Sequence, residues 1–291
     1  MTSQPATLTA ANCPPPTVLV TVVNYNSGDW LRRCAEAVLA STVPVALRIG
    51  DNGSSDASLA DLPADPRLTV LRNNANLGFA TALNRLLADS DAPWLLVLNP
   101  DCRIEADTLE RLLTIAEAHP QVGMFGCLIA NPDGSEQRGC RRRLPTLGTA
   151  ALRSLGLGRL FNGRANFDLT GSPLPSAPIE QEAISGAFML IRRAALQAVG
   201  PMDEGYFLHC EDLDWCARFP RAGWPILFVP SVRVTHEQGS CSVSRPYFVE
   251  WHKHRGMLRY YAKFHGRLGA LLLAPLVWAR FALVALRRAL R

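Results

Sequence analysis

Short, almost wholly apolar segments alternate with amphipathic ones over the first 130 residues, and this alternation most constrains the fold. Continuous apolar runs of this length are typical of strands buried on both faces of a sheet. Strands that alternate with helices predict a mostly parallel α/β sheet with right-handed crossovers. The predicted strands are residues 17–23, 45–49, 68–71, 94–98 and 122–129, and the predicted helices are 30–40, 77–88 and 106–118, with a short helix from about residue 55.

The regular alternation stops at residue 131. Residues 131–182 are rich in Gly, Pro and Arg, and a loop of that length is uncommon unless it is functional. Strands at 183–191 and 226–234 and helices at 194–199 and 213–221 then follow. We expect a disordered leader over 1–16, a globular domain over 17–245 and a helical tail over 246–291. Asp29 is a candidate N-cap for the first helix.

The net charge of +5 is unevenly placed along the chain. Residues 251–291 hold nine of the 30 Lys and Arg residues and none of the 25 acidic ones. The rest of the chain is therefore net negative, which argues against a nucleic-acid-binding body. In the tail, the longest uncharged stretch is the 12 residues 268–279, which include Pro275. A membrane span needs roughly 20 apolar residues, so we predict a basic amphipathic helix on an anionic membrane surface. A packing helix and a kinked insertion are the alternatives.

The cysteines and the N-terminus indicate a compartment. No pair of the 8 Cys has the CxxC spacing of a zinc or redox site, and a chain of 291 residues does not need disulfides. The N-terminus lacks the basic and apolar regions of a secretory signal. These features predict reduced thiols in a cytoplasmic protein.

Polar residues follow three of the predicted strands, where ligands bind in open α/β sheets. Asn24 and Asn26 follow the first strand, Asp51 the second, and Asn99 and Asp101 the fourth. A carboxylate after a strand can accept the imide N–H of uracil or thymine, or hold Mg²⁺ or Mn²⁺; it can also simply form a turn or cap a helix. No GxGxxG or GxxxxGK pattern is present, which excludes the usual dinucleotide and P-loop sites.

The densest acidic cluster lies near residue 212. Glu211, Asp212 and Asp214 precede Trp215 at a predicted helix start, where the helix dipole alone stabilises one or two carboxylates. One of them can instead act as a general base toward an acceptor hydroxyl. His236 follows the late strand, where a histidine is either an ordinary side chain or a metal ligand.

Taken together, these segments resemble the family 2 glycosyltransferases, which have the GT-A fold, and within them the bacterial rhamnosyltransferases that act on lipid-linked acceptors. The resemblance spans about residues 18–242. It is carried by residues 20–26, Asp51-Asn52-Gly53-Ser54-Ser55-Asp56, residues 74–80, Leu98-Asn99-Pro100-Asp101, Ser185-Gly186-Ala187 and residues 207–215.

The resemblance implies a role for each matching residue. Asn99-Pro100-Asp101 stands where the family usually has Asp-x-Asp, so Asp101 would be the main metal carboxylate and His236 would complete the site. Asp212 matches the catalytic base. The nucleotide and donor would be bound by Asn24, Asn26, Asp51, Asn76, Gly78, Asn99 and Asp101, and the donor or acceptor sugar by Gly186, Glu211, Asp214 and Trp215.

The implied function is an inverting transfer of L-rhamnose from dTDP-L-rhamnose to a hydroxyl of a glycan or lipid-linked saccharide, in cell-surface polysaccharide synthesis. It implies Mg²⁺ or Mn²⁺, a polyprenyl-diphosphate-linked acceptor, and a peripheral place on the inner face of the cytoplasmic membrane. Arg141-Arg142-Arg143 would meet the acceptor diphosphate, or form a solvated loop. The alternatives are a UDP-dependent hexosyl or galactofuranosyl transferase, a sugar-phosphate nucleotidyltransferase and a non-catalytic sugar-binding module.

Overall fold

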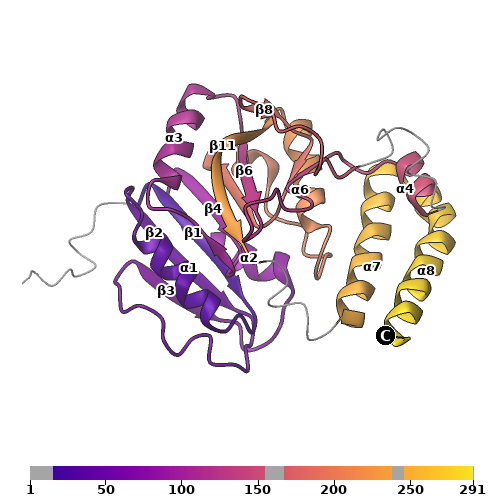
Figure 1. Ribbon diagram of the computed structural model, residues 1–291, viewed down its shortest axis with the longest axis horizontal. Coiled ribbons are helices and arrows are strands. Elements are labelled where there is room, and N and C mark those ends of the chain that lie inside the picture. The colour runs from indigo at the N-terminus through magenta and orange to yellow at the C-terminus, as the bar shows by residue number, and fades with distance from the viewer. Residues whose placement is uncertain (1–15, 155–166, 238–245, 291) are drawn as a thin grey trace, which may run out of the picture.

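A mixed, mostly parallel sheet forms the centre of the computed structural model, which describes residues 16–154, 167–237 and 246–290 (Figure 1). The strands follow the order β3-β2-β1-β4-β10-β6-β11-β5, with β8 paired to β11. β10 runs antiparallel to β4 and β6, and β5 antiparallel to β11. The main strands are β1 Val18–Asn24, β2 Val45–Asp51, β3 Leu68–Arg72, β4 Trp94–Leu98, β5 Cys102–Arg103, β6 Met124–Ala130, β10 Phe188–Arg192 and β11 Ile226–His236.

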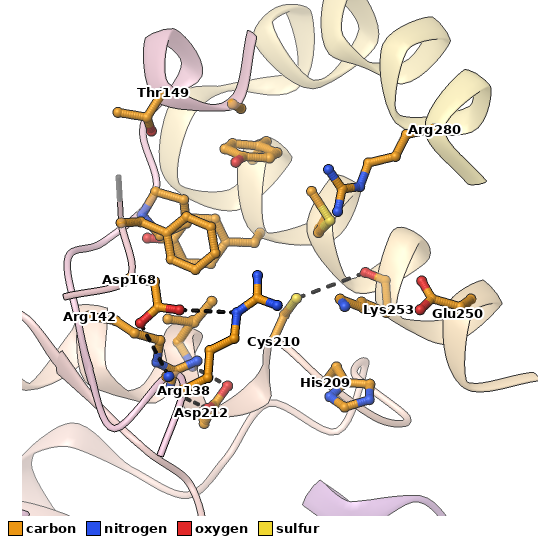
Figure 2. A pocket seen from close by; sticks show the side chains of 18 residues that line it. Arg138, Arg142, Thr149, Asp168, His209, Cys210, Asp212, Glu250, Lys253 and Arg280 are labelled. Atoms are coloured by element: carbon orange, nitrogen blue, oxygen red, sulfur yellow. Dashed lines mark hydrogen bonds and ion pairs between the residues drawn. The ribbon is translucent and has the colours of Figure 1, made fainter. Parts of the chain in front are cut away.

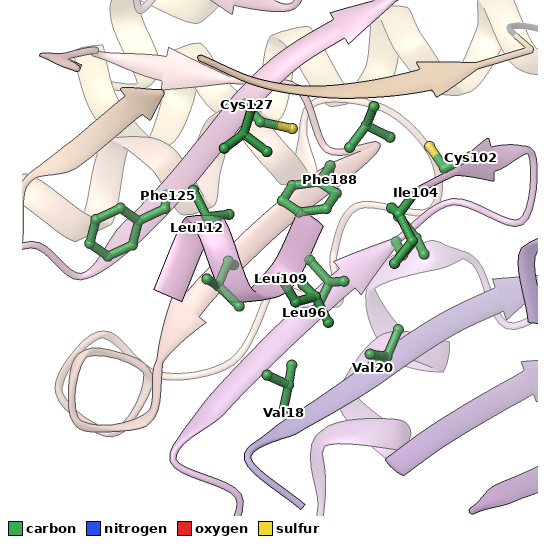
Figure 3. Close-up of a cluster of buried hydrophobic side chains, with 14 of the residues drawn as sticks. Val18, Val20, Leu96, Cys102, Ile104, Leu109, Leu112, Phe125, Cys127 and Phe188 are labelled. Atoms are coloured by element: carbon green, nitrogen blue, oxygen red, sulfur yellow. The ribbon is translucent and has the colours of Figure 1, made fainter. Parts of the chain in front are cut away.

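Alternate residues of each central strand face opposite layers of helices. Val18, Val20 and Val22 of β1 belong to one core, which α1 (Asp29–Leu39) and α3 (Thr108–Ala118) cover (Figure 3). Leu19 and Val23 belong to the other, covered by α2 (Phe79–Leu87), α5 (Arg193–Val199) and α6 (Glu211–Arg221). Because successive strand side chains point to opposite faces, a run of apolar residues fills both cores at once. The predicted mixed, mostly parallel α/β sheet flanked by helices is confirmed.

Several predicted local features differ in the structure. Turns replace the short helix expected from residue 55. Asp29 does not cap α1 but lies in its first turn, where it pairs with Arg32 and Arg33. The segment 131–182 is not a bare loop: it holds β7 (Arg141–Arg142), α4 (Leu147–Ser154) and β8 (Ile179–Glu180), and β7 pairs with β9 (Ala183–Ile184).

The tail forms two helices, α7 (Pro246–His265) and α8 (Arg267–Ala289), which pack side by side against α4 (Figure 1). A third apolar cluster joins them to α4 and α6. Salt bridges also fix α7 to the sheet domain, because Asp203 pairs with Arg259 and Lys263 at 2.7 and 2.8 Å. By length and composition, α8 is apolar enough to cross a membrane. The division at residue 245 stays a prediction, and all but the last residue of the predicted leader lie outside the described residues.

Candidate active site

One edge of the sheet gathers most of the predicted site residues. Asn24 ends β1 opposite Asp51, the end of the parallel strand β2. β4 runs parallel to β1, and its Leu98 pairs with Val22, so Asn99 leaves the sheet at the same edge. β10 starts at this edge because it is antiparallel to β4, and the N–H of Asn99 donates to the carbonyl of Ala187 at 3.0 Å.

The ends of β1 and β2, where nucleotide binding was predicted, form a hydrogen-bonded network. The amide of Asn24 donates to Asp51 Oδ1 and Ser54 Oγ, each at 3.0 Å. Asn26 Oδ1 accepts the N–H of Ser55 at 2.8 Å. Asn24 is fully buried and Asp51 is 4% exposed, so the Asn24 amide holds the Asp51 side chain in place. Base recognition by Asp51 stays a prediction.

The loop that follows β3 packs tightly against the segment that precedes α6. Asn52 Nδ2 donates to the carbonyl of Gly78 at 3.1 Å and contacts Asn76 Oδ1 at 3.4 Å. Gly78 has φ +83°, and a Cβ there would lie 2.7 Å from the carbonyl oxygen of Phe207. Glycine is therefore required both by conformation and by close backbone approach.

The predicted metal residues lie together at the middle of the edge. His236 Nε2 is 3.0 Å from Asp101 Oδ1 and 3.3 Å from Asn99 Nδ2, and both His236 and Asp101 are 7% exposed. Gln137 Nε2 donates to the His236 carbonyl at 3.0 Å and to Asn131 Oδ1 at 3.1 Å. Its Oε1 therefore faces His236 Nδ1, at 2.6 Å, and accepts a hydrogen bond from that N–H.

This arrangement fits a divalent cation. Because Nδ1 is turned to Gln137, Nε2 is the ring nitrogen that faces Oδ1 of Asp101, so a nitrogen and a carboxylate oxygen point into the same space. An imidazole nitrogen and a carboxylate oxygen suit Mn²⁺, and such sites take their remaining ligands from water and substrate phosphates. No group of three His, Cys, Asp or Glu side chains capable of holding a metal occurs in the described part of the chain. In such a site the protein would supply Asp101 and His236.

Asp212 lies close to this edge, beside Gly186. A Cβ at Gly186 would come within 3.1 Å of Asp212 Cβ, and Gly186 adjoins the Ala187 that Asn99 contacts. Arg142 Nη2 donates to Asp212 Oδ2 at 2.5 Å, with only 13% and 17% of the two side chains exposed. Burial acts to raise the pKa of Asp212, but the charge and hydrogen bond of Arg142 outweigh it, so this pKa lies below its usual value. The side chain is therefore a carboxylate at neutral pH.

The other residues of the acidic cluster have different surroundings. Asp214 is fully buried and bonded to Arg218, Lys263 and the hydroxyl of Tyr206. Trp215 is also fully buried, and its indole N–H donates to Gly200. These contacts give both side chains a structural role, and neither lines the cavity described below. Their contact with a sugar stays a prediction.

Glu211 differs from its neighbours because it is buried with an unpaired oxygen. It is 7% exposed, and its Oε2 has no hydrogen-bond partner within the described residues. Burial, together with the charge of Asp212, raises the pKa of Glu211. The pKa values of these adjacent carboxyl groups are thus shifted in opposite directions, upward for Glu211 and downward for Asp212. Of the two, Asp212 is the one that is ionised and can accept a proton at pH 7.

A strained turn precedes α6. His209 and Cys210 both have positive φ, of 68° and 72°, a conformation that costs non-glycine residues energy and concentrates at functional sites. α7 packs directly on this turn, since a Cβ at Gly256 would lie 2.7 Å from the His209 carbonyl oxygen. The turn was not predicted, because nothing in the letters His-Cys signals a left-handed pair.

A cavity of about 510 Å³ opens beside Asp212, between the sheet domain and the helical tail (Figure 2). Sequence reasoning missed most of its lining, which comes from segments far apart in the chain: Arg138, Arg142, Asp168, His209, Cys210, Asp212, Lys253, Met257, Tyr260 and Arg280 are among the residues. The arginine triplet is only partly at this cavity. Arg141 is 3% exposed and pairs with Glu136 through two nitrogens, so the expectation that it meets a diphosphate is wrong.

Comparison with known proteins shows which proteins this chain resembles. A sequence model described as "Glycosyltransferase like family 2" matches residues 14–256. The N-acetylglucosaminyl-diphospho-decaprenol L-rhamnosyltransferase of Mycobacterium tuberculosis is 32% identical over 283 residues, which cover 92% of this chain and 90% of that protein. The rhamnosyltransferase WbbL of Escherichia coli K12 is 27% identical over 151 residues, covering 50% and 53%.

Two solved structures share the fold at low identity. A mannosyltransferase from Pyrobaculum calidifontis in complex with GDP-Man and Mn²⁺ matches with a TM-score of 0.55 and 15% identity, covering 94% of this chain and 78% of that one. GalNAc-T7 with UDP, GalNAc and Mn²⁺ matches with a TM-score of 0.60 and 17% identity, covering 85% and 48%.

Proposed function

The chain belongs to the family 2 glycosyltransferases, and from that premise we propose that it transfers L-rhamnose from dTDP-L-rhamnose to the sugar of a polyprenyl-diphosphate-linked acceptor. The M. tuberculosis relative supports this proposal, because it matches 92% of this chain over 90% of its own length and its name specifies an L-rhamnosyltransferase for N-acetylglucosaminyl-diphospho-decaprenol. The single structural observation that carries the reaction is the carboxylate of Asp212, which lines the cavity and is ion-paired with Arg142.

The proposed chemistry is a single displacement. Asp212 takes the proton of an acceptor hydroxyl as that oxygen forms a bond to the anomeric carbon of the donor. The bond from that carbon to the diphosphate oxygen breaks on the opposite side, so dTDP leaves with the electron pair and the anomeric configuration inverts. A divalent cation, when bound, would offset the charge that develops on the leaving diphosphate. Asp101 and His236 would hold it, with Gln137 fixing the ring.

A donor and acceptor screen tests the proposal. The protein is incubated with dTDP-L-rhamnose, UDP-glucose, UDP-galactose or UDP-galactofuranose and a synthetic GlcNAc-diphosphate that carries a short alkyl chain. Nucleotide release and product mass are measured with Mn²⁺, Mg²⁺ or EDTA, and NMR gives the new anomeric configuration. We expect rhamnosyl transfer with inversion and loss of turnover in EDTA. Preference for a UDP donor would refute the proposed donor, and retention of the anomeric configuration would refute the single displacement. No product from any donor would refute the proposed activity.

We further propose that α8 places the enzyme on the inner face of the cytoplasmic membrane. Its outward residues are apolar and repeat at helical spacing: Leu268, Leu271, Leu272, Leu283, Leu286 and Leu290 are 47–78% exposed. Arg267 and Arg287 lie near its two ends and suit anionic headgroups. The other side of α8 packs on the charged helix α7. A spanning position would bring α7 into the hydrocarbon, so an interfacial position is favoured.

Vesicle flotation tests this location. Leu272→Glu with Leu283→Glu should reduce binding to phosphatidylglycerol-containing vesicles and leave transfer to the short-chain acceptor unchanged. Leu174→Glu is the matched control, since Leu174 is 46% exposed outside the helical tail. Equal flotation of the double variant and the wild type would refute the role of α8.

A further inference from the structure

The cavity beside Asp212 contains two cations that have no carboxylate partner within the described residues. Arg138 pairs with Asp168 and Arg142 with Asp212, while the nearby Glu250 pairs with Arg288 of α8. Lys253 from α7 and Arg280 from α8 also line the cavity, and neither makes an ion pair within the part of the chain that the structure describes. Figure 2 shows both side chains on the tail side of the cavity, across from Asp212.

Two unpaired cations on one wall of a concave site favour a doubly charged anion. His209 adds no third cation to the cavity, because burial, and then the charge of Lys253, lower its pKa to about 4 and leave the imidazole neutral at pH 7. Glu250 also lines this side of the cavity, but within the described residues its ion pairs are with Arg288 and His254 and not with Lys253 or Arg280. A diphosphate accepts hydrogen bonds from an ammonium and a guanidinium at the same time.

The rest of the lining suits an amphiphilic molecule. Met257, Tyr260 and Tyr261 of α7, with Pro145 and Ala150, make one side of the cavity apolar or aromatic. The same helix α8 that brings Arg280 inward presents its leucines outward. A lipid chain leaving the cavity past α8 would thus meet the surface that we place on the membrane.

We propose that Lys253 and Arg280 bind the diphosphate of the lipid-linked acceptor in this cavity, with its sugar directed toward Asp212. The inference rests on the proposed function and adds the site at which the acceptor is recognised. The loop from Gln137 to Arg142 links the two substrates, since Gln137 holds His236 on the donor side and Arg138 and Arg142 line the acceptor cavity.

Direct binding tests the site without requiring turnover. Titration calorimetry measures the affinity of wild type, Lys253→Met, Arg280→Met and the double variant for GlcNAc-diphosphate with a short alkyl chain. Methionine keeps the apolar stem of each side chain, so folding should be preserved, and thermal unfolding verifies it. Arg255→Ala on α7 and Arg287→Ala on α8 are matched controls, since both residues are exposed and neither lines the cavity.

Each lost cation should weaken binding by roughly tenfold, as expected for a hydrogen bond to a charged group. Binding of the neutral alkyl glycoside of GlcNAc, and of dTDP, should change little, and the controls should resemble wild type. Equal acceptor affinity in the double variant and wild type, or no wild-type binding at all, would overturn the proposal. If dTDP binding weakens instead, the cavity serves the donor and the proposal is wrong; if only vesicle binding weakens, the cations contact lipid headgroups and it is equally wrong.

The two proposals can fail separately. Wild type that binds the acceptor through Lys253 and Arg280 but transfers no sugar would refute the proposed function and leave the binding site intact as a conclusion. If the wild type transfers rhamnose and the double variant has the same KM for the diphosphate acceptor as the wild type, the proposed function stands and the proposed binding site is refuted.

Discussion

Replacing Asp212 with Asn, alone and together with Arg142→Met, separates the catalytic role of this carboxylate from its structural one. Arg142 Nη2 and Asp212 Oδ2 are 2.5 Å apart and mostly buried. The single substitution would leave the guanidinium without a counter-ion, and Arg142 Nε already lacks a partner within the described residues. Removing one member of a buried ion pair costs about 3–5 kcal/mol. At about 2–4 °C per kcal/mol, Tm should fall by roughly 6–20 °C.

The kinetic and stability effects should then diverge in the double variant. Asp212→Asn should lower kcat by roughly 10²–10⁴-fold, the usual contribution of a general base. Adding Arg142→Met removes the uncompensated charge, and replacing both members of a buried pair by neutral groups is often nearly neutral in stability. The double variant should therefore recover most of the lost Tm and none of the lost kcat.

Thermal unfolding followed by circular dichroism, and transfer assays below every Tm, provide the two measurements. Nucleotide binding should be retained in both variants. Asp65→Asn is a control for ion-pair loss, because Asp65 pairs with Arg67 outside the site. The assignment of Asp212 as base fails if either variant transfers rhamnose at a rate within about tenfold of wild type. An unchanged Tm in the single variant would show that the ion pair does not contribute as argued.

Three further perturbations test the surrounding architecture. Gly78→Ala should lower the free energy of unfolding by about 2–4 kcal/mol, because the new Cβ meets the Phe207 carbonyl in a left-handed conformation. The control Gly171→Ala has a left-handed conformation but open space around it, so it should lower the free energy of unfolding by only about 1 kcal/mol. Equal losses for the two variants in urea titrations would contradict the steric argument. Gln137→Leu should weaken Mn²⁺ binding about 10–100-fold in calorimetry with dTDP present; unchanged affinity would sink the ring-orienting role. Asp203→Asn should cost about 1 kcal/mol at neutral pH, discounted for its half-exposed partners. Since the pKa of Asp203 is lowered in the folded state from its usual 3.8, this difference should be complete well above pH 3.8 and shrink as the pH falls below it, whereas a difference that widens in acid would refute the assignment.

The sheet and its functional edge could be predicted because both follow from local pattern and strand geometry. Residues 18–24 are apolar on both faces up to Asn24, apart from Thr21, so the strand and its end are visible in the letters. Parallel pairing then places Asp51 and Asn99 at that same edge without knowledge of any contact. His236 was recognisable for the same reason, as the last residue of β11.

The partners of these residues could not be predicted, because nothing periodic links them. Gln137 lies 99 positions from His236, and Arg142 lies 70 positions from Asp212. Both pairs depend on how the segment 131–182 folds across the sheet, and its short strands pair antiparallel through only two residues each. The acidic cluster was hard to interpret for a different reason. Its residues are chemically alike, but the helix places Asp214 in the core and Asp212 at the cavity.

The basic residues of the tail have more than one role, and this changes how the tail is expected to bind a membrane. Sequence alone assigns its cations to an anionic surface. In the structure Lys253 and Arg280 face the cavity, and Arg259 and Lys263 pair with Asp203. With those four engaged inside the protein, fewer of the nine tail cations remain for lipid headgroups, so the proposed membrane binding relies more on the outward leucines of α8. Apolar burial does not depend on screening; membrane binding by this tail should therefore persist at salt concentrations that release a polybasic segment.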